Sequence, residues 1–397
     1  MNWFIIITAL VSGSYLAFSS RCRKSKDWKA LVTPLASIMG SGFLVSLPLL
    51  AGSVGNLALV FMAGLLLLAY GVGGAIRFNI RHFEPVENDR GLAQGVAFIS
   101  RIVLAAAYFI SVAYYLQLLA AFVLGSFNIH DVQLANWITT ALLLLIGFVG
   151  IWKGLRTLES VETYAVSLNL GMIAALLLAL VWHNGMLLAT GGWTLPEITG
   201  SIDFTDLRVV LGLLIVVQGF ETSRYLGSEH PAEQRIRTMR LAQWISSGIY
   251  LVFIALATVL YHKGLGSDVT AIIDMTRPVA WILPIMIAIA AVGSQFSAAV
   301  ADTAGAGGLI QDISKRRVPL PVAYGFMMLV TVALTWETNV NEIISFASRA
   351  FALFYFLQCV VAGMMANSQK RTILLKGRFF GLALICLVVF LFGIPSE

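Results

Sequence analysis

A succession of long apolar runs, separated by short polar turns, constrains this chain more than any other feature. A helix needs about 20 apolar residues to cross the hydrocarbon core of a bilayer, and each run is long enough. Hydrophobic residues make up 59% of the 397 residues and charged residues 12%, whereas soluble domains contain about 25% charged residues. The sequence therefore predicts an all-α polytopic membrane protein. About twelve transmembrane helices are expected, at residues 2–19, 30–51, 55–77, 99–125, 134–152, 161–183, 207–227, 240–262, 279–311, 320–336, 342–366 and 374–394.

Lys and Arg residues gather on one side of the expected membrane. If the loop RCRKSKDWK after the first span faces the cytoplasm, 22 of the 26 basic residues lie on that side and three lie outside. Cytoplasmic loops carry an excess of Lys and Arg, so both termini are expected outside, with the bacterial inner membrane as the location. This orientation also explains the net charge of +6, so no nucleic-acid partner is expected. The first span is expected to remain as a helix, since a signal peptide carries its charges before the apolar run.

Two of the expected spans contain glycine interruptions. Gly40-Ser41-Gly42 lies in the middle of LVTPLASIMGSGFLVSLPLLAG, and Gly219 lies in the middle of DLRVVLGLLIVVQGFETSRYLG. With the first span left out, the next ten divide five and five, and each interruption falls in the leading span of its half. Transporters built from inverted repeats bind substrates between two such broken helices, where the unwound backbone lines a cavity and helix starts attract anions. Close packing between helices is a simpler explanation of the same glycines.

The stretches around these glycines resemble the amino acid–polyamine–organocation (APC) superfamily. IMGSGFLVSLPLLAG is similar to the first-helix motif of that superfamily. GFETSRYLGSEHPAEQRIRTMRLA is similar to the sixth-helix motif, with matches at Gly219, Phe220, Glu221, Glu229, Pro231 and Arg235. The resemblance covers about residues 25–365.

This resemblance implies the LeuT-type fold, a 5+5 inverted repeat with discontinuous first and sixth core helices. It divides the chain into an extra N-terminal helix with a basic loop (1–28), a transport core (29–366) and a C-terminal accessory helix (367–397). It also implies which residues line the substrate site at the two breaks. These are Gly40, Ser41, Gly42, Gly219, Phe220 and Glu221.

Two charged residues lie at bilayer depth, where charges are costly and usually functional. Glu221 lies 14 residues into its span, and we interpret it as a carboxylate that gates the substrate cavity or changes protonation. An ion pair with Arg224 is the alternative. Arg349 follows Glu342 by seven residues, which places it about 10 Å deep. It is expected to bind a substrate carboxylate, close an outer gate, or pair with Glu221 or Asp302, unless it extends toward the interface.

A further set of polar residues suggests coupling to a cation. Ser297, Asp302 and Thr303 lie in the span 279–311. In sodium-coupled transporters of this fold, hydroxyls on the equivalent helix face backbone carbonyls before the first break, and the resemblance places those carbonyls at Ala36 and Met39. We therefore expect these residues to bind a coupling Na⁺, or Asp302 to exchange a proton. Ordinary hydrogen bonding between helices is the alternative for the hydroxyls.

Two adjacent tyrosines, Tyr114 and Tyr115, fall on the third core helix of the implied fold, which lines the cavity. One of them is expected to contact the substrate. The other is expected to pack against neighbouring helices or to lie at the interface.

Other classes of protein fit the sequence less well. The five histidines lie in loops or at span ends, and the three cysteines lack metal-binding spacing. No enzyme activity, cofactor or resident metal is therefore expected, other than Na⁺ if sodium is the coupling ion. We expect a secondary transporter for a small amino acid or related carboxylate, with a coupling cation and the lipid bilayer as further partners. A permease for an inorganic ion or organic anion, and a sensor without flux, are the alternatives.

Overall fold

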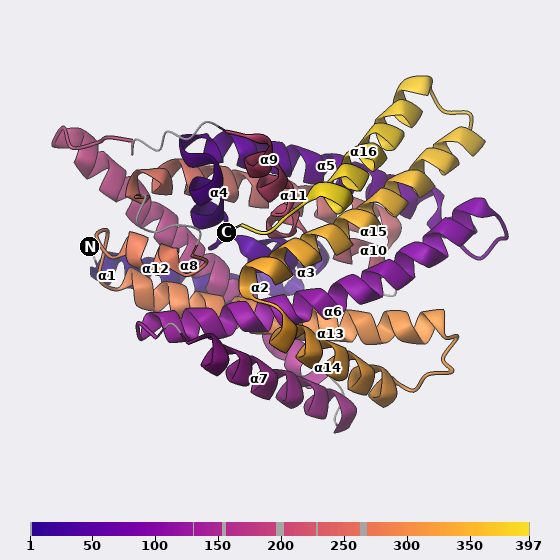
Figure 1. Cartoon of the computed structure of the whole chain (residues 1–397), viewed down its shortest axis with the longest axis horizontal. Helices are drawn as coiled ribbons and strands as arrows, with labels where there is room; N and C mark the ends of the chain where they lie inside the picture. The colour runs from indigo at the N-terminus through magenta and orange to yellow at the C-terminus, as the bar shows by residue number, and fades with distance from the viewer. Residues whose placement is uncertain are drawn as a thin grey trace.

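The computed structural model describes residues 2–129, 131–152, 156–195, 202–227, 229–262 and 268–396, and every element within these ranges is a helix (Figure 1). Side chains at positions 23, 41 and 156–163 lie outside this description. Ten of the described segments are long and apolar enough to cross a membrane. The predicted all-α membrane architecture is thereby confirmed.

Ten of the twelve predicted spans correspond to long helices that are not interrupted in mid-membrane. Their ends differ from the predicted ends by a few residues up to about two turns, because helices continue into the polar interface. They are α1 (Asn2–Phe18), α5 (Ala58–His82), α6 (Leu92–Ser126), α7 (Val132–Trp152), α8 (Arg156–Ala189), α11 (Ala232–Ala257), α13 (Leu283–Ile313), α14 (Leu320–Glu337), α15 (Val340–Ser368) and α16 (Ile373–Phe392). Short helices in the connections are α2 (Ser20–Lys24), η1 (Gly55–Leu57), η2 (Glu84–Val86), η4 (Thr258–Leu260) and α12 (Ala271–Thr276).

The two remaining spans are broken, as predicted. The first consists of α3 (Lys26–Gly42) and α4 (Ser46–Val54), separated by three residues. The second consists of α9 (Phe204–Leu211), the 3-10 turn η3 (Leu214–Val217) and α10 (Thr222–Tyr225). Asp203 starts α9 with a capping box, in which its side chain accepts hydrogen bonds from the N–H groups of Thr205 and Asp206.

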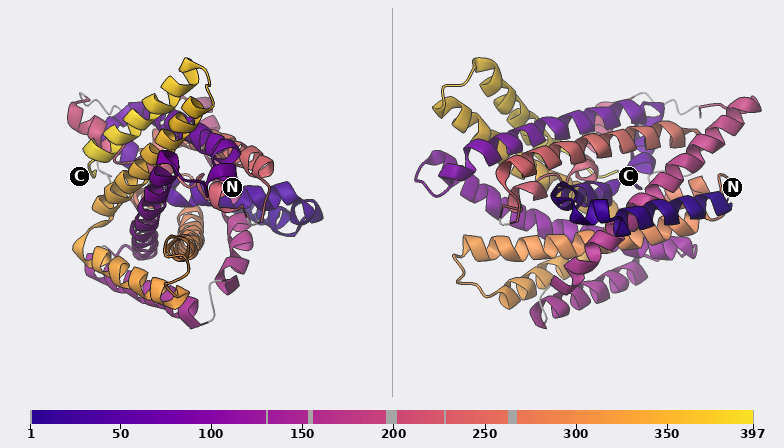
Figure 2. Two further views of the ribbon diagram at one scale, coloured as in Figure 1. Left: turned by 90° about the vertical axis from the view of Figure 1, so that its right-hand side faces the viewer. Right: turned by 180° about the vertical axis from the view of Figure 1, so that it is seen from behind.

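The contacts between helices follow the expected repeat. The second core helix α5 packs against the seventh, α11; the third, α6, against the eighth, α13; and the fourth, α7, against the ninth, α14. The first core span contacts the sixth through α3 and η3. Figures 1 and 2 show α6 beside α13 and α7 beside α14. The first four pairs of counterpart helices in the two halves therefore meet, as expected for a 5+5 inverted repeat.

The two helices outside these ten spans pack on the flanks of the bundle. α1 packs along α8, and a Cβ on Gly171 of α8 would lie 2.6 Å from the backbone nitrogen of Gly13. Ala9, Gly13 and Ala17 are buried on the same face of α1, so small residues allow close approach of the two backbones. α16 packs against α15 and α5.

Candidate functional site

The two broken helices touch each other at their glycines. A Cβ on Gly42 would lie 2.6 Å from the Cα of Val216 in η3, and a Cβ on Gly219 would lie 2.6 Å from the carbonyl carbon of Ser37 in α3. Gly219 also has φ +112°, a backbone conformation that residues with a Cβ atom rarely adopt. Both positions therefore require glycine, and the two breaks lie side by side.

The first break begins later than the glycine pattern suggested. Gly40 lies inside α3, where a Cβ would meet the carbonyl oxygen of Ser294 at an ordinary 3.6 Å. Ser41 is also helical, and its side chain lies outside the described part of the structure. The chain leaves the helix at Phe43–Val45. Of the predicted glycines in this stretch, only Gly42 contacts the second broken helix.

Glu221 lies at the second break and is fully buried. Its Oε2 accepts hydrogen bonds from the N–H of Gly219 at 3.0 Å and from the hydroxyl of Tyr355 at 2.8 Å. Its Oε1 is buried and has no hydrogen-bond partner among the described residues. Phe220 stacks on the Tyr355 ring, with centroids 5.2 Å apart. The carboxylate predicted to face the site thus holds the unwound backbone in place and keeps one oxygen available.

Side chains from four helices bridge to the breaks. From α6, Tyr115 accepts a hydrogen bond from Gln218 at 2.7 Å, and Tyr114 packs against the Tyr115 ring. From α15, Ser348 accepts a hydrogen bond from the N–H of Ile215 at 2.8 Å. The sequence pointed to the tyrosine pair, and Tyr115 is the member that contacts the second break.

Two bridging residues were not predicted. The hydroxyl of Tyr250 on α11 lies 3.1 Å from the carbonyl oxygen of Ile38 and 2.5 Å from that of Val216, so it reaches both broken helices. Gln295 on α13 donates to the carbonyl oxygen of Gly40 at 2.9 Å. The sequence did not predict these two contacts, because the sequence of a helix does not show which of its faces packs against an unwound segment of another helix.

The centre of the site is closed. Phe220, Glu221, Tyr355 and Tyr115 are each no more than 1% exposed. A substrate between the breaks would therefore be shielded from both sides of the membrane. Entry and exit require these aromatic side chains to move.

The residues predicted to couple a cation divide into two groups. Ala36 and Ser297 line a shared cavity of about 30 Å³, together with Ser294, Asn169 and Thr222. That volume is enough for about one water molecule. The side chains of Ser294, Ser297 and Thr222 provide hydroxyl oxygens to its lining, and the side chain of Asn169 provides an amide oxygen. Ala36 and Ser297 therefore come together as predicted, and the lining adds Asn169, which the prediction did not include.

Asp302, Thr303 and Met39 lie elsewhere. Asp302 on α13 accepts a hydrogen bond from the hydroxyl of Ser111 on α6, and it does not line the cavity of Ala36 and Ser297. Thr303 donates to the carbonyl oxygen of Ala299 in its own helix at 2.7 Å. Met39, whose backbone carbonyl was expected to face the ion, does not line that cavity either. The structure therefore does not bring the five predicted coupling residues to one point.

The side chain of Arg349 is directed to α16. Its Nε donates to the carbonyl oxygen of Phe390, near the end of α16, at 2.8 Å, and its guanidinium lies over the Phe390 ring. None of its described contacts involves Glu221 or Asp302. An arginine near a helix C-terminus stabilises the unpaired carbonyls there. In this closed structure Arg349 therefore fastens α16 to α15, and its role toward a substrate carboxylate stays a prediction.

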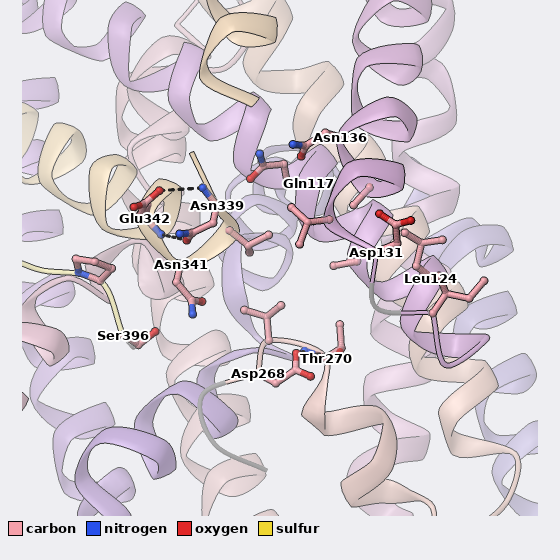
Figure 3. Close-up of a pocket in the computed structure, with 17 residues that line it drawn as sticks. Gln117, Leu124, Asp131, Asn136, Asp268, Thr270, Asn339, Asn341, Glu342 and Ser396 are labelled. Carbon is pink, nitrogen blue, oxygen red and sulfur yellow. Dashed lines mark hydrogen bonds between the residues drawn. The ribbon is translucent and has the colours of Figure 1, made fainter. Parts of the chain in front are cut away.

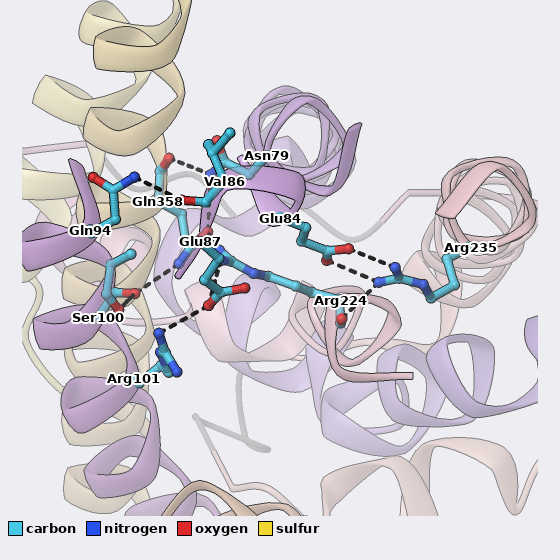
Figure 4. A network of polar contacts seen from close by, with 11 residues as sticks. Asn79, Glu84, Val86, Glu87, Gln94, Ser100, Arg101, Arg224, Arg235 and Gln358 are labelled. Atoms are coloured by element: carbon cyan, nitrogen blue, oxygen red, sulfur yellow. Dashed lines mark hydrogen bonds and ion pairs between the residues drawn. The ribbon is translucent and has the colours of Figure 1, made fainter. Parts of the chain in front are cut away.

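Arg224 belongs to a polar network at one end of the bundle, which Figure 4 shows from close by. It contacts Gln358 on α15 and lies 3.8 Å from Glu87, and Glu87 also pairs with Arg101 at 3.0 Å. Arg235 binds Glu84 at 2.6 Å. Arg224 thus pairs with Glu87 rather than with Glu221, and the network ties α10, α11, α15 and the α5–α6 connection together.

A larger cavity, of about 540 Å³, lies at the opposite end of the bundle (Figure 3). It is bordered by the α6–α7 connection, the start of α12, the start of α15 and the C-terminal tail. Its charged lining residues are Asp131, Asp268 and Glu342, and each accepts a hydrogen bond from a backbone N–H at the start of a helix. Such a vestibule favours cations and zwitterions over anions.

Comparisons with known proteins agree with this architecture. A family model described as an APC superfamily transporter matches residues 20–393. A protein of Aquifex aeolicus (strain VF5), described as uncharacterized, is 41% identical over 375 residues, which is 92% of this chain and 91% of that protein.

Solved structures share the fold at low sequence identity. A mutant manganese transporter from Eremococcus coleocola superposes with a TM-score of 0.59 at 16% identity and covers 92% of this chain and 87% of its own. The same transporter in complex with an aromatic bis-isothiourea substituted compound has a TM-score of 0.59 at 15% identity, covering 94% and 90%.

Proposed function

The chain belongs to the APC superfamily of transporters, and from that premise we propose that it moves a small amino acid or related carboxylate across the membrane, coupled to Na⁺ or H⁺. The family and the proteins of similar structure are transporters rather than enzymes. The observation on which the substrate assignment rests is the available Oε1 of Glu221 at the second break.

The two breaks offer complementary groups to an amino acid. An ionised carboxylate only accepts hydrogen bonds, so Glu221 Oε1 suits an ammonium group. α4 begins at Ser46, four residues after Gly42. Pro48 has no N–H, and the N–H of Leu49 bonds the carbonyl oxygen of Val45. The N–H groups of Ser46 and Leu47 are therefore the ones in this first turn that lack acceptors within the helix. These N–H groups suit a carboxylate. The close contact between the broken helices limits the substrate to a small one.

Two arrangements support coupling to a cation. The cavity that contains Ala36 and Ser297 provides oxygen ligands for Na⁺ between α3, α8 and α13. Alternatively, Glu221 exchanges a proton, since a buried carboxylate at bilayer depth is a common element of proton relays. Uptake under imposed Na⁺ and H⁺ gradients distinguishes these two arrangements.

Uptake into proteoliposomes tests the function directly. Radiolabelled small amino acids and carboxylates are offered under an imposed Na⁺ gradient, an imposed H⁺ gradient, or neither. Under the proposal, one gradient drives accumulation above the equilibrium level. If the gradient is Na⁺, Ser297→Ala should weaken the Na⁺ dependence, whereas Ser126→Ala, in the exposed last turn of α6, should not. If it is H⁺, Glu221→Gln should abolish the response of uptake to pH, whereas Ser126→Ala should retain it.

A ligand screen separates transport from sensing. A compound that binds the native state raises the thermal unfolding midpoint. A ligand that raises the midpoint without flux under any gradient would contradict the transporter proposal and support a sensor. Absence of both binding and flux across amino acids and carboxylates would refute the substrate class.

A permease for an inorganic cation is the second candidate. The similar solved structures are of manganese transporters, and Glu221 is an oxygen ligand at the break. Among the described residues, however, no group of three or more His, Cys, Asp or Glu gathers, and divalent transition metals usually bind such groups. Mn²⁺ uptake that competes with no amino acid would favour this candidate.

A further inference from the structure

A pocket of about 270 Å³ lies between α5, α11 and α16, outside the site described above. We call it the arginine pocket because four arginines line it, with Tyr70, Phe78 and His82 beside them. The arginines are Arg77, Arg81, Arg240 and Arg378. It lies at the end of the molecule that carries the basic loops, which the charge distribution places on the cytoplasmic side.

Arg77 is the buried member of this pocket, at 7% exposure. Its guanidinium donates to the side-chain oxygen of Gln243 and to the carbonyl oxygen of Tyr70, and it lies 5.0 Å from the centre of the Tyr70 ring. Gln243 is itself held by a bond to the carbonyl oxygen of Ala69 at 2.9 Å. All of these partners are neutral, whereas a buried guanidinium is normally paired with an anion.

The other arginines add to this uncompensated charge. Arg378 Nη2 and Arg77 Nη2 lie 3.3 Å and 3.8 Å from the position that a Cβ on Gly74 would take, so both guanidiniums flank the same residue. Arg81 pairs with the exposed Glu233. Within the described residues, Arg240 and Arg378 have neither a hydrogen bond nor an ion pair. The pocket therefore has three guanidiniums without a carboxylate.

The surroundings of the pocket suit a lipid rather than a dissolved ion alone. Trp244 is 63% exposed on α11 and meets the Tyr70 ring edge-on at 5.6 Å. Leu241, next to Arg240, and Phe380, on α16, are also exposed. Tryptophan and tyrosine gather where the headgroups meet the acyl chains. Arg77 lies five residues before the end of α5, which is about 8 Å along the helix axis. This distance corresponds to the depth at which the headgroups meet the acyl chains.

We propose that the arginine pocket binds the phosphate group of an anionic phospholipid from the inner leaflet. Guanidinium groups form paired hydrogen bonds with phosphate oxygens, and basic pockets between membrane helices on this side bind anionic headgroups. Arg77, Arg240 and Arg378 contact the phosphate, and the acyl chains lie along the exposed apolar faces of α11 and α16. The bound lipid ties the accessory helix α16 to two helices of the transport core.

Titration of the full-length protein with phosphatidylglycerol in detergent micelles tests this site, with the thermal unfolding midpoint as the readout. The variant is Arg240→Gln/Arg378→Gln, because both side chains are exposed and the variant should fold. The control is Arg237→Gln/Arg317→Gln, which removes the same charge from the same side of the membrane outside the pocket. Phosphatidylcholine and inorganic phosphate are titrated in parallel.

Phosphatidylglycerol should raise the midpoint of the wild type and of the control, and phosphatidylcholine should not. The phosphatidylglycerol fraction needed for half of the effect should rise about thirtyfold in the pocket variant, because each arginine near an anionic surface contributes about fivefold. Equal responses of the variant and the control would overturn the site. A shift produced by inorganic phosphate, with none added by the lipid, would overturn the lipid assignment.

Discussion

The two broken helices differ in how they are broken. The first interrupts its helix for three apolar residues, Phe43–Val45, and resumes as the nine-residue helix α4. Phe43 and Val45, the first and last residues of this break, keep negative φ and helical ψ values. The second is unwound from Gly212 to Glu221, with a 3-10 turn, an extended Gln218 and a positive φ at Gly219.

This difference assigns different roles to the two breaks. The first provides a close-packed apolar surface and backbone groups, namely carbonyl oxygens and the N–H groups at the start of α4, and the second provides the polar side chains Gln218 and Glu221. Substitutions at the second break should therefore affect transport most, and substitutions at the first should act mainly through packing. The following predictions test that distinction.

Gly219→Ala should have the largest effect. The added methyl would contact the backbone of Ser37 at 2.6 Å, and the positive φ is strained for alanine. We expect a loss of about 2–4 kcal/mol in unfolding free energy and no measurable transport. Gly40→Ala is the control, since its methyl would make ordinary contacts. Thermal unfolding of both variants in detergent checks this, and equal midpoints would contradict it.

Tyr355→Phe should reduce transport by roughly tenfold. It removes the hydroxyl that donates to Glu221 at 2.8 Å, and a lost hydrogen bond to a charged group costs about 1.5–3 kcal/mol. Initial uptake rates in proteoliposomes, corrected for protein content, measure the change. Tyr15→Phe, on the exposed surface of α1, should match the wild type. Full activity of Tyr355→Phe would mean that transport does not depend on the hydrogen bond between Tyr355 and Glu221.

Gly42→Ala should destabilise the protein less than Gly219→Ala does. Its methyl would also approach a backbone atom, at 2.6 Å from Val216, but the residue remains helical and no φ strain is added. Overpacking alone costs about 1–3 kcal/mol. Unfolding midpoints of the two variants under identical conditions decide the order. A larger loss at Gly42 would reverse the proposed roles of the breaks.

Arg349→Gln should have the smallest effect on transport. Its described contacts are with Phe390 on α16, so we expect a loss of about 1 kcal/mol in stability and an unchanged KM. Uptake measured over a range of substrate concentrations gives the KM. A KM raised by tenfold or more for carboxylate substrates would show that Arg349 reaches the substrate in another state.

The positions of the spans and of both breaks follow from the sequence because they depend on local properties. Apolar length determines a span, and glycine at Gly42 and Gly219 allows the close contact that each break needs. Depth along a helix is also local, so Glu221 could be placed at bilayer depth. These features need no knowledge of the neighbouring helices.

The direction in which a side chain points depends on the neighbours and on the turn of the helix. Each residue rotates by about 100°, so Asp302 lies about 140° around α13 from Ser297. Asp302 therefore faces α6 when Ser297 faces the cavity. On α15, Ser348 and Tyr355 differ by only about 20°, whereas Arg349 lies about 120° from Tyr355. A helical projection of α15 therefore places Ser348 and Tyr355 on one face of the helix and Arg349 on another.

The hydroxyl of Tyr250 has a mechanical consequence. It lies within hydrogen-bonding distance of carbonyls in α3 and η3, and the glycine contacts already bring these two segments together at the backbone. The two interrupted spans and α11 are therefore expected to move as one rigid unit. Three hydrogen bonds at the second break join this unit to α6 and α15: Gln218–Tyr115, Glu221–Tyr355 and Ser348 to the N–H of Ile215. These three bonds must break if the unit rotates to expose the solute to the other side of the membrane.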